Sequence, residues 1–374
     1  MARVRVLQLA GSAEWAGGEV YLLQLAKALD RTRFELSVIC PAMGPLVERL
    51  GRLGVATAVV PMEERLVDPR ALLALVRHFR RERPHVVQSH GARTNFYGRL
   101  AARLAGVPRH LSTVHNSLYD YPVPALRRAL YLALDRLTVP WTETILCVAE
   151  SLARDLIERG RVPAEKVQVI HNGVDLARFD PSRADGGKIR RAFGLASGPV
   201  LGLIGRMTPQ KDHATFLAAL ARVRTEVHDV RALIVGDGPL RPAITAEAAR
   251  LGVQEACCFT GVRDDIPDCL AAMDLVLISS VSEGLPFTVL EALAMARPIV
   301  ATAVNGVTEI VEPELTGLLV PPRRPDLLAQ GALALLRDPE RARALGQAGR
   351  KAVEVRFPME RMVERLERLY LGDA

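Results

Sequence analysis

The sequence is poor in aromatic residues and cysteine, and it has no long uncharged apolar run. Aromatic residues make up 5% of the 374 residues, and the five cysteines lack paired motifs, which is typical of reduced thiols in a cytoplasmic protein. Since a membrane-spanning helix needs a run of about 18 apolar residues, no span is expected. The N-terminus, MARVRVLQLAG, alternates basic and apolar residues. That alternation predicts a strand, and it lacks the unbroken apolar core expected of a signal peptide.

The chain also lacks a dinucleotide-binding fingerprint and a metal-binding motif. In the first turn after the predicted N-terminal strand, GSAEWAGGE, the glycines stand at 11, 17 and 18, and GDGPLR from Gly236 lacks a third glycine. This spacing disfavours a nicotinamide or flavin dehydrogenase. The eight histidines are scattered without the spacing of metal ligands, so neither a metal nor a cofactor is expected.

Basic residues are abundant and unevenly placed. Residues 1–180 hold 25 Lys and Arg against 18 Asp and Glu, although the net charge of the whole chain is +7. An anionic partner is one interpretation, and an arginine-rich solvated surface is the other. Nucleic acid is not expected, because no nucleic-acid module is recognisable and stacking aromatics are few. Three basic stretches could contact a membrane surface, or could simply be the surface faces of crossover helices. They are VRHFRRERP, ARLAGVPRH and RRALYLALDRL.

Short apolar runs alternate with helical patterns along the chain. The strand-like runs include RVRVLQLA, FELSVIC, HVVQSH and HLSTVHN, and, in the second half, VLGLIG, ALIVG, CCFTG, LVLISS and PIVATAV. This rhythm predicts parallel sheets covered on both faces. The polar, glycine-rich stretch DPSRADGGKIR, from Asp180, reads as a linker or loop. The sequence therefore predicts two doubly wound α/β units divided near residues 172–186, and an amphipathic helix at the C-terminus.

Two glutamates flank an apolar segment, SEGLPFTVLEAL, in the second unit. Glu283 follows a predicted strand, residues 284–286 form a turn, and a helix begins near Phe287. The free N–H groups of its first turn favour an anion. Glu291, about one turn further, could accept hydrogen bonds from a diol such as ribose. The alternative is a helix-start glutamate stabilised by the helix dipole.

A second cluster, GRMTPQK, follows the strand that ends at Gly205. Arg206 and Lys211 are two cations at the carboxyl end of a strand, where ligands of such sheets bind. A guanidinium fork and a mobile ammonium suit a diphosphate. A solvated loop with two positive residues is the alternative.

Taken in order, the motifs GGE, HN, NGVD, GR-x4-K, FTG and E-x7-E resemble those of a known enzyme family. They resemble the retaining GT-B glycosyltransferases, the family 4-like group that includes phosphatidylinositol mannosyltransferases and sucrose synthase. The resemblance implies two Rossmann-like domains facing each other across a cleft. An acceptor-side domain would span residues 1–172 and a returning helix at 356–374, and a donor-binding domain would span 173–355.

The resemblance also implies a role for each matching residue. Arg206 and Lys211 would hold the donor diphosphate, Glu291 the ribose, and Glu283 the hydroxyls of the transferred sugar. Catalysis is assigned to Glu283, Arg206, Lys211 and His115. Donor binding is assigned to Gly17, Gly18, Arg206, Lys211, Gly261, Val262, Arg263, Glu283, Gly284, Leu285, Pro286, Phe287, Thr288 and Glu291.

Each histidine in this scheme has a structural alternative. His115 matches a family histidine near the donor sugar, but a histidine at a strand end can also be structural. His85 and His90 flank a strand and are expected to be structural or solvent-facing. Asn172 is expected to be structural at the domain junction.

The implied activity is transfer of a hexosyl or N-acetylhexosaminyl group from a nucleoside-diphosphate sugar, with UDP favoured. The acceptor would be a hydroxyl of a glycan, a lipid-linked or a small molecule. Retention of configuration and independence of metal are expected. A nucleotide-sugar epimerase and a non-catalytic nucleotide-sugar sensor are the alternatives; a phosphorylase is disfavoured because lysines for a pyridoxal cofactor are scarce.

Overall fold

The computed structural model describes residues 3–13, 17–62, 68–117, 119, 124–195 and 197–373. The chain forms two compact units, residues 1–172 with 359–374 and residues 173–358. The returning segment thus begins at Met359, whereas the sequence-based division placed its start at 356. Among the described residues, no helix is long and apolar enough to cross a membrane.

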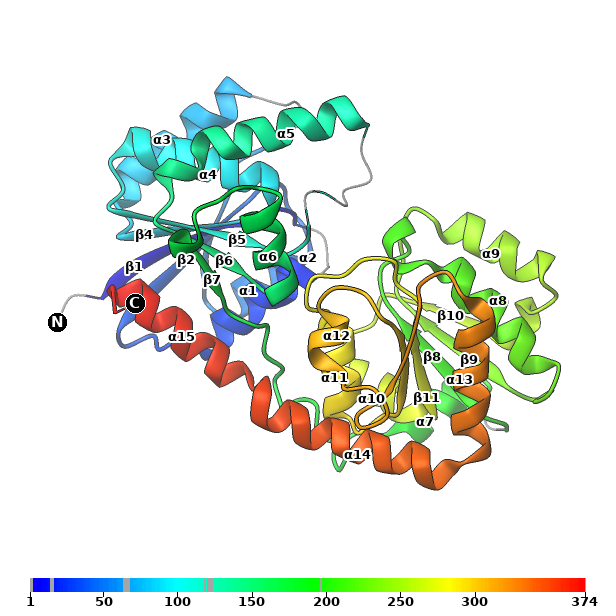
Figure 1. Ribbon diagram of the computed structural model, residues 1–374. Coiled ribbons are helices and arrows are strands. Elements are labelled where there is room, and N and C mark those ends of the chain that lie inside the picture. The colour runs from blue at the N-terminus through cyan, green and yellow to red at the C-terminus, as the bar shows by residue number, and fades with distance from the viewer. Residues whose placement is uncertain are drawn as a thin grey trace. The chain divides into compact units, whose positions relative to one another are not determined.

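The N-terminal unit is built on a seven-stranded parallel sheet of order β3-β2-β1-β4-β5-β6-β7 (Figure 1). Its strands are β1 (Val4–Leu9), β2 (Phe34–Cys40), β3 (Ala56–Val59), β4 (Val86–His90), β5 (Arg109–Val114), β6 (Thr144–Cys147) and β7 (Val167–Val169). Central strands such as β4 are buried throughout, because helices cover both faces of a parallel sheet.

Helix α4 packs against α3 and α5 on one side of this sheet, and α1 packs with α2 and α15 on the other (Figure 1). The helices are α1 (Gly17–Ala28), α2 (Pro45–Arg52), α3 (Pro69–Glu82), α4 (Ala92–Ala105), α5 (Ala125–Thr138), α6 (Glu150–Glu158) and α15 (Met359–Leu371). Their ends follow local rules. Asp68 caps α3 by accepting from the N–H of Arg70, Pro69 opens the helix, and Arg83 ends it in the left-handed conformation before Pro84.

The C-terminal unit is built on a six-stranded parallel sheet of order β10-β9-β8-β11-β12-β13. Its strands are β8 (Val200–Ile204), β9 (Arg231–Val235), β10 (Cys257–Gly261), β11 (Leu275–Ile278), β12 (Ile299–Thr302) and β13 (Leu318–Val320). The strand order matches that of the first six strands of the N-terminal unit. The prediction of two doubly wound parallel sheets is confirmed.

Helices on both faces bury the C-terminal sheet. They are α7 (Gly186–Ala192), α8 (His213–Arg224), α9 (Arg241–Arg250), α10 (Ile266–Ala272), α11 (Phe287–Ala294), α12 (Val307–Ile310), α13 (Pro325–Arg337) and α14 (Pro339–Arg356). α8 and α13 pack together on one side, where Phe216, Leu220 and Leu328 are fully buried.

The prediction of a linker or loop from Asp180 is partly wrong. Asp185 caps α7 by accepting from the N–H of Lys188, and α7 packs on α10. Gly186 allows this close approach, because a Cβ there would lie 2.4 Å from the carbonyl carbon of Ala271. The polar and glycine-rich composition hid the helix, since Gly186 serves a close backbone contact instead of a flexible loop.

Candidate active site

The loops that follow β8 and β11 are joined by hydrogen bonds. The carbonyl oxygen of Gln210 accepts from the N–H of Val281 (2.9 Å), and the Gln210 Nε2 donates to the carbonyl oxygen of Ser282 (2.8 Å). The Ser279 hydroxyl donates to the carbonyl oxygen of Lys211 (2.9 Å). These strands are neighbours at the switch point of the sheet, where ligands of open α/β folds bind. The structure therefore brings the two polar loops together at one edge.

A buried ion pair lies between these loops. Lys211 Nζ donates to Glu283 Oε1 at 2.6 Å, and the Ser280 hydroxyl donates to the same oxygen at 2.6 Å. The side chain of Glu283 is 6% exposed and that of Lys211 21%. A carboxylate tolerates such burial only when it is paired and hydrogen-bonded. An ammonium has three donors, so Lys211 can hold Glu283 and still donate to a ligand.

Arg206 lies on the exposed part of the same loop, one residue after Gly205. A Cβ at Gly205 would lie 3.4 Å from Cδ of Lys211, a tight contact. Gly236, with φ of 132°, packs on Gly205 so closely that an added Cβ would be 2.1 Å from the Gly205 carbonyl oxygen. Glycine at these positions lets the loops after β8 and β9 pack backbone to backbone.

Helix α11 begins in the loop after β11 without a side-chain cap. The backbone N–H groups of Phe287 and Thr288 make no hydrogen bond to any residue in the described part of the chain. Gly284, Leu285, Pro286 and Phe287 are buried, and Thr288 is half-buried. Free N–H groups at a helix start favour a bound anion.

Glu291, on α11, is a buried carboxylate with unused acceptor capacity toward the residues that the structure describes. Its residue is 7% exposed, and its carboxylate bonds no side chain or backbone donor among the residues described. Burial raises the pKa of Glu291 to about 7, and the positive charge of Arg178 opposes that increase. A carboxylate with unused acceptor capacity is suited to a ligand that brings its own donors, such as a diol.

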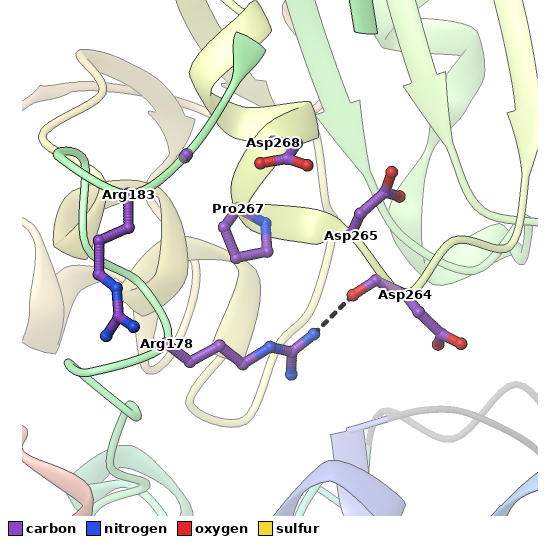
Figure 2. A pocket seen from close by; sticks show the side chains of 7 residues that line it. Arg178, Arg183, Asp264, Asp265, Pro267 and Asp268 are labelled. Carbon is purple, nitrogen blue, oxygen red and sulfur yellow. Dashed lines mark hydrogen bonds between the residues drawn. The ribbon is translucent and has the colours of Figure 1, made fainter. Parts of the chain in front are cut away.

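Arg178 connects the NGVD segment to the loop after β10. Its guanidinium donates to the carbonyl oxygen of Asp264 at 2.8 Å, as Figure 2 shows. It lines a pocket of about 260 Å³ together with Arg183, Ala184, Asp264, Asp265, Pro267 and Asp268. Sequence reasoning missed Arg178, although its place within the NGVDLARF stretch, four residues after Val174, was the available signal.

Three residues that the resemblance assigns to donor binding, Gly261, Val262 and Arg263, lie at the end of β10. Gly261 ends the strand with φ of 73°, and Val262 is exposed. Arg263 is held by Asp265 in a two-point ion pair of 2.7 and 2.6 Å, and its guanidinium lies over the Phe193 ring at 5.1 Å. Its fork is therefore already occupied in this structure, so backbone groups are the better candidates for base contacts.

In the N-terminal unit, His115 follows β5 and lies against His90 and Tyr21. Nε2 of His115 and Nδ1 of His90 are 3.0 Å apart, and the two rings stack with centroids 5.3 Å apart. The Tyr21 ring meets His115 edge-on at 5.2 Å. Burial lowers the pKa of His115 to about 4. His115 is therefore neutral at pH 7 and cannot supply a fixed positive charge.

Sequence reasoning did not recognise the part played by His90. The residue is 3% exposed and hydrogen-bonded, so it is not solvent-facing. His85, at the other end of β4, is exposed, and its Nδ1 accepts from the N–H of Arg5. The usable signal was that β4 and β5 are consecutive strands, whose carboxyl ends must be close in a parallel sheet.

Gly18, one of the two predicted glycines of the first loop, lies beside the same histidine. Gly17 is the first residue of α1, and a Cβ on Gly18 would be 3.9 Å from the ring of His115. In the C-terminal unit the structure thus assembles Arg206, Lys211, Glu283 and the start of α11; in the N-terminal unit it assembles Gly18 and His115. Within the described residues, no group of three or more His, Cys, Asp or Glu side chains could hold a metal ion.

Two family models match the chain, glycosyltransferase family 4 over residues 15–178 and glycosyl transferases group 1 over residues 198–338. An Escherichia coli UDP-Gal:alpha-D-GlcNAc-diphosphoundecaprenol alpha-1,3-galactosyltransferase is 28% identical over 357 residues, which cover 93% of this chain and 92% of that protein. A 2-deoxystreptamine glucosyltransferase of Streptomyces kanamyceticus is 31% identical over 68% of both chains.

Solved structures agree on the fold. Anabaena Alr3699/HepE in complex with UDP and glucose superposes with a TM-score of 0.88 and 22% identity, covering 100% of both chains. The strand orders, the two family matches and these relatives lead to one conclusion. The chain belongs to the GT-B glycosyltransferases, in the group that carries the family 4 and group 1 glycosyltransferase domains.

Proposed function

We propose that this glycosyltransferase transfers a sugar from a UDP-sugar to a hydroxyl group with retention of configuration and without a metal. The donor would bind the C-terminal unit, residues 173–358. The choice of UDP is supported by the E. coli relative, named for UDP-Gal, and by the structure of HepE with UDP and glucose. The proposed transferred group is a hexosyl or N-acetylhexosaminyl group.

The observation that carries the proposal is the buried carboxylate of Glu291, which accepts no hydrogen bond from a residue that the structure describes, on the helix whose first N–H groups likewise lack a described acceptor. The Glu291 carboxylate would accept from the two ribose hydroxyls, and the N–H groups of Phe287 and Thr288 would donate to a phosphate. A structural glutamate in this position would be expected to have a donor partner, because burying an unpaired carboxylate is unfavourable.

The chemistry follows from the charges in this site. As the diphosphate leaves, Arg206, Lys211 and the start of α11 would stabilise its growing negative charge without a metal ion. Glu283 accepts from Lys211 and Ser280 at 2.6 Å each, so it is held as a hydrogen-bonding group and is a poor nucleophile. We therefore favour attack by the acceptor on the face from which the phosphate leaves, with that phosphate as the base.

Calorimetric titration with UDP, GDP and ADP tests the donor site. UDP should bind the wild-type chain, and Glu291→Gln should weaken that binding by about 10-fold, the loss of roughly one charge-assisted hydrogen bond. Equal affinity in the variant would remove the ribose assignment. NMR of the product formed from a tightly bound UDP-sugar then reports the configuration of the new linkage, and conversion of the donor without acceptor would indicate an epimerase.

The acceptor is proposed to be a glycan, a small molecule or a lipid-linked molecule, with a specific observation favouring the last. The solvent-facing side of α5 is an apolar stripe of Leu126, Ala129, Leu130, Ala133 and Leu137, continued by Trp141. Leu126 is 83% exposed and Leu137 65%. These residues recur at the helical period, so they form one apolar face, here called the α5 stripe.

Charge around the α5 stripe favours an anionic lipid surface as its partner. The N-terminal unit, residues 1–172 and 359–374, carries 27 Lys and Arg against 20 Asp and Glu, while the C-terminal unit has 22 of each. Arg136 is exposed and directly precedes Leu137 of the stripe, so a basic side chain borders it. An apolar stripe with basic flanks is the pattern of interfacial helices. We propose that the enzyme works in the cytoplasm at the inner face of the membrane.

A further inference from the structure

A chain of hydrogen bonds runs through the interior of the N-terminal unit and ends at His115. Its other members come from β1, β4, β5, α1 and α15, and each is at most 3% exposed. They are Gln8, Tyr21, Gln88, His90, Thr113 and Tyr370. Buried polar chains of this kind are stable only when every donor meets an acceptor, so the direction of each bond depends on the next.

The two glutamine amides give this chain its direction. Gln88 Nε2 donates to Thr113 Oγ1 (2.7 Å) and to the Tyr21 hydroxyl (3.4 Å), which leaves Gln88 Oε1 as an acceptor. Gln8 Nε2 donates to that oxygen (3.2 Å) and to the Tyr370 hydroxyl (3.1 Å), and the Tyr370 hydroxyl donates to Gln88 Oε1. Gln8 Oε1 is consequently the atom that faces His90, and it can only accept.

The direction is passed on through His90. Gln8 Oε1 is 2.7 Å from His90 Nε2, so that nitrogen carries the proton. Burial lowers the pKa of His90 well below its usual value, and a neutral imidazole has only one N–H. His90 Nδ1 therefore accepts, and the atom 3.0 Å from it, His115 Nε2, must be the donor. The Nδ1 of His115 is left with a lone pair.

We propose that His90, Gln8 and Tyr370 are positioning residues that hold His115 as its Nε2–H tautomer, so that His115 Nδ1 accepts a hydrogen bond from a sugar hydroxyl. This assignment rests on the proposed function for the nature of the ligand. His115 Nδ1 bonds no residue within the described ranges. The Tyr21 ring meets the His115 ring edge-on, and the backbone of Gly18 lies close to the His115 ring as well.

Through Tyr370, the returning helix α15 is connected by hydrogen bonds to His115. Tyr370 lies on α15, and its ring also meets Phe34 edge-on at 6.0 Å. Turning one amide alone would oppose two donors or two acceptors inside the core, which costs about 1–3 kcal/mol for each unsatisfied group. The amides and the imidazoles can therefore reverse only together, and Tyr370 helps to select one of the two states.

Nitrogen NMR of the full chain labelled with [15N]histidine reads the tautomer directly, without substrate. The expected result is a His115 resonance pair with Nε2 protonated and Nδ1 bare, assigned by its loss in His115→Gln. Protonation at Nδ1 would overturn the proposal, since it would mean that the whole chain runs in the opposite direction. Tyr370→Phe should introduce a second tautomer; an unchanged spectrum would remove Tyr370 from the positioning set.

Kinetics of His90 variants provide the second test. An asparagine oxygen can occupy the place of the histidine Nδ1, so His90→Asn should keep most of the turnover, whereas His90→Leu should lower kcat by at least about 10-fold. The affinity for UDP should be unchanged in both, which separates this outcome from failure of the donor site. Equal kcat in the two folded variants would mean that His90 packs in the core but does not orient His115. His85→Asn, at the exposed end of β4, is the matched control.

Discussion

The two units share a strand order but place different chemistry at their switch points. In the N-terminal unit the adjacent strands β1 and β4 carry Gln8 and His90, a neutral pair 2.7 Å apart within the sheet. In the C-terminal unit the loops after the equivalent strands β8 and β11 carry Lys211 and Glu283, an ion pair 2.6 Å apart. One topology thus supports a neutral hydrogen-bonding edge and a charged one.

This difference matches the two kinds of group that a glycosyl transfer must handle. A departing diphosphate needs fixed positive charge, while sugar and acceptor hydroxyls need oriented, neutral donors and acceptors. The net charge of the units runs the other way, since the N-terminal unit is basic and the C-terminal unit is neutral. Overall charge therefore does not locate the anion site; local pairing and helix starts do.

Breaking the ion pair should have the largest effect. Lys211→Ala should lower turnover by about 100- to 1,000-fold, because one donor to the leaving group is lost. It should also lower the free energy of unfolding by about 3–5 kcal/mol, because Glu283 is left buried and unpaired. Kinetics and urea unfolding measure the two effects. Lys351→Ala, an exposed lysine on α14, is the control and should change neither.

Arg206→Ala should separate catalysis from stability more cleanly. The residue is exposed, so the midpoint of thermal unfolding should remain within about a degree or two of wild type. Turnover should nevertheless fall by about 100-fold if the guanidinium stabilises the leaving diphosphate. Loss of thermal stability in proportion to activity would instead make Arg206 part of the loop's structure.

Glu291→Gln sharpens the comparison through pH. The pKa of Glu291 is raised to about 7 from an ordinary value near 4.5, so the folded state binds the extra proton between these values. The contribution of Glu291 to stability should therefore be fully present below pH 4.5 and fall by about 3 kcal/mol as pH rises through 7. Glu291→Gln should remove that fall, unfolding later than wild type at pH 8 and alike at pH 4.5. A parallel pH dependence in both proteins would argue against the assignment.

The α5 stripe should contribute a smaller, surface-specific effect. Replacing Leu126, Leu130 and Leu137 by Gln should lower binding to vesicles containing phosphatidylglycerol by about 10-fold, because exposed apolar area is lost. Binding of the wild type should also weaken with added salt. Turnover of a water-soluble acceptor should not change. Leu315→Gln, an exposed leucine of the other unit, is the control; equal losses in both variants would count against a membrane-facing helix.

Particular residues show how far the sequence could predict this molecule. Alternating apolar runs predicted both sheets, because a strand buried on two faces is apolar whatever its partners. The three-residue β7 and the glycine-containing α7 were missed, since both depend on tertiary contacts more than on local pattern. Glu283, Lys211 and Glu291 were proposed from motifs. The Lys211–Glu283 pair and the His90–His115 bond could not be, because they join residues 72 and 25 positions apart.

The smallest expected effect concerns metal. Fixed positive charge in the C-terminal unit is proposed to stabilise the leaving diphosphate, as Mg²⁺ does in other enzymes. EDTA should therefore leave turnover within about twofold of its untreated value. In the C-terminal unit, Lys211, Arg206 and two N–H groups that lack an acceptor among the described residues already lie at one sheet edge. Lys211→Ala should in turn become sensitive to added Mg²⁺, which could replace part of the lost charge. Full loss of wild-type activity with EDTA, restored by Mn²⁺, would mean that the leaving group needs a cation that these residues do not supply.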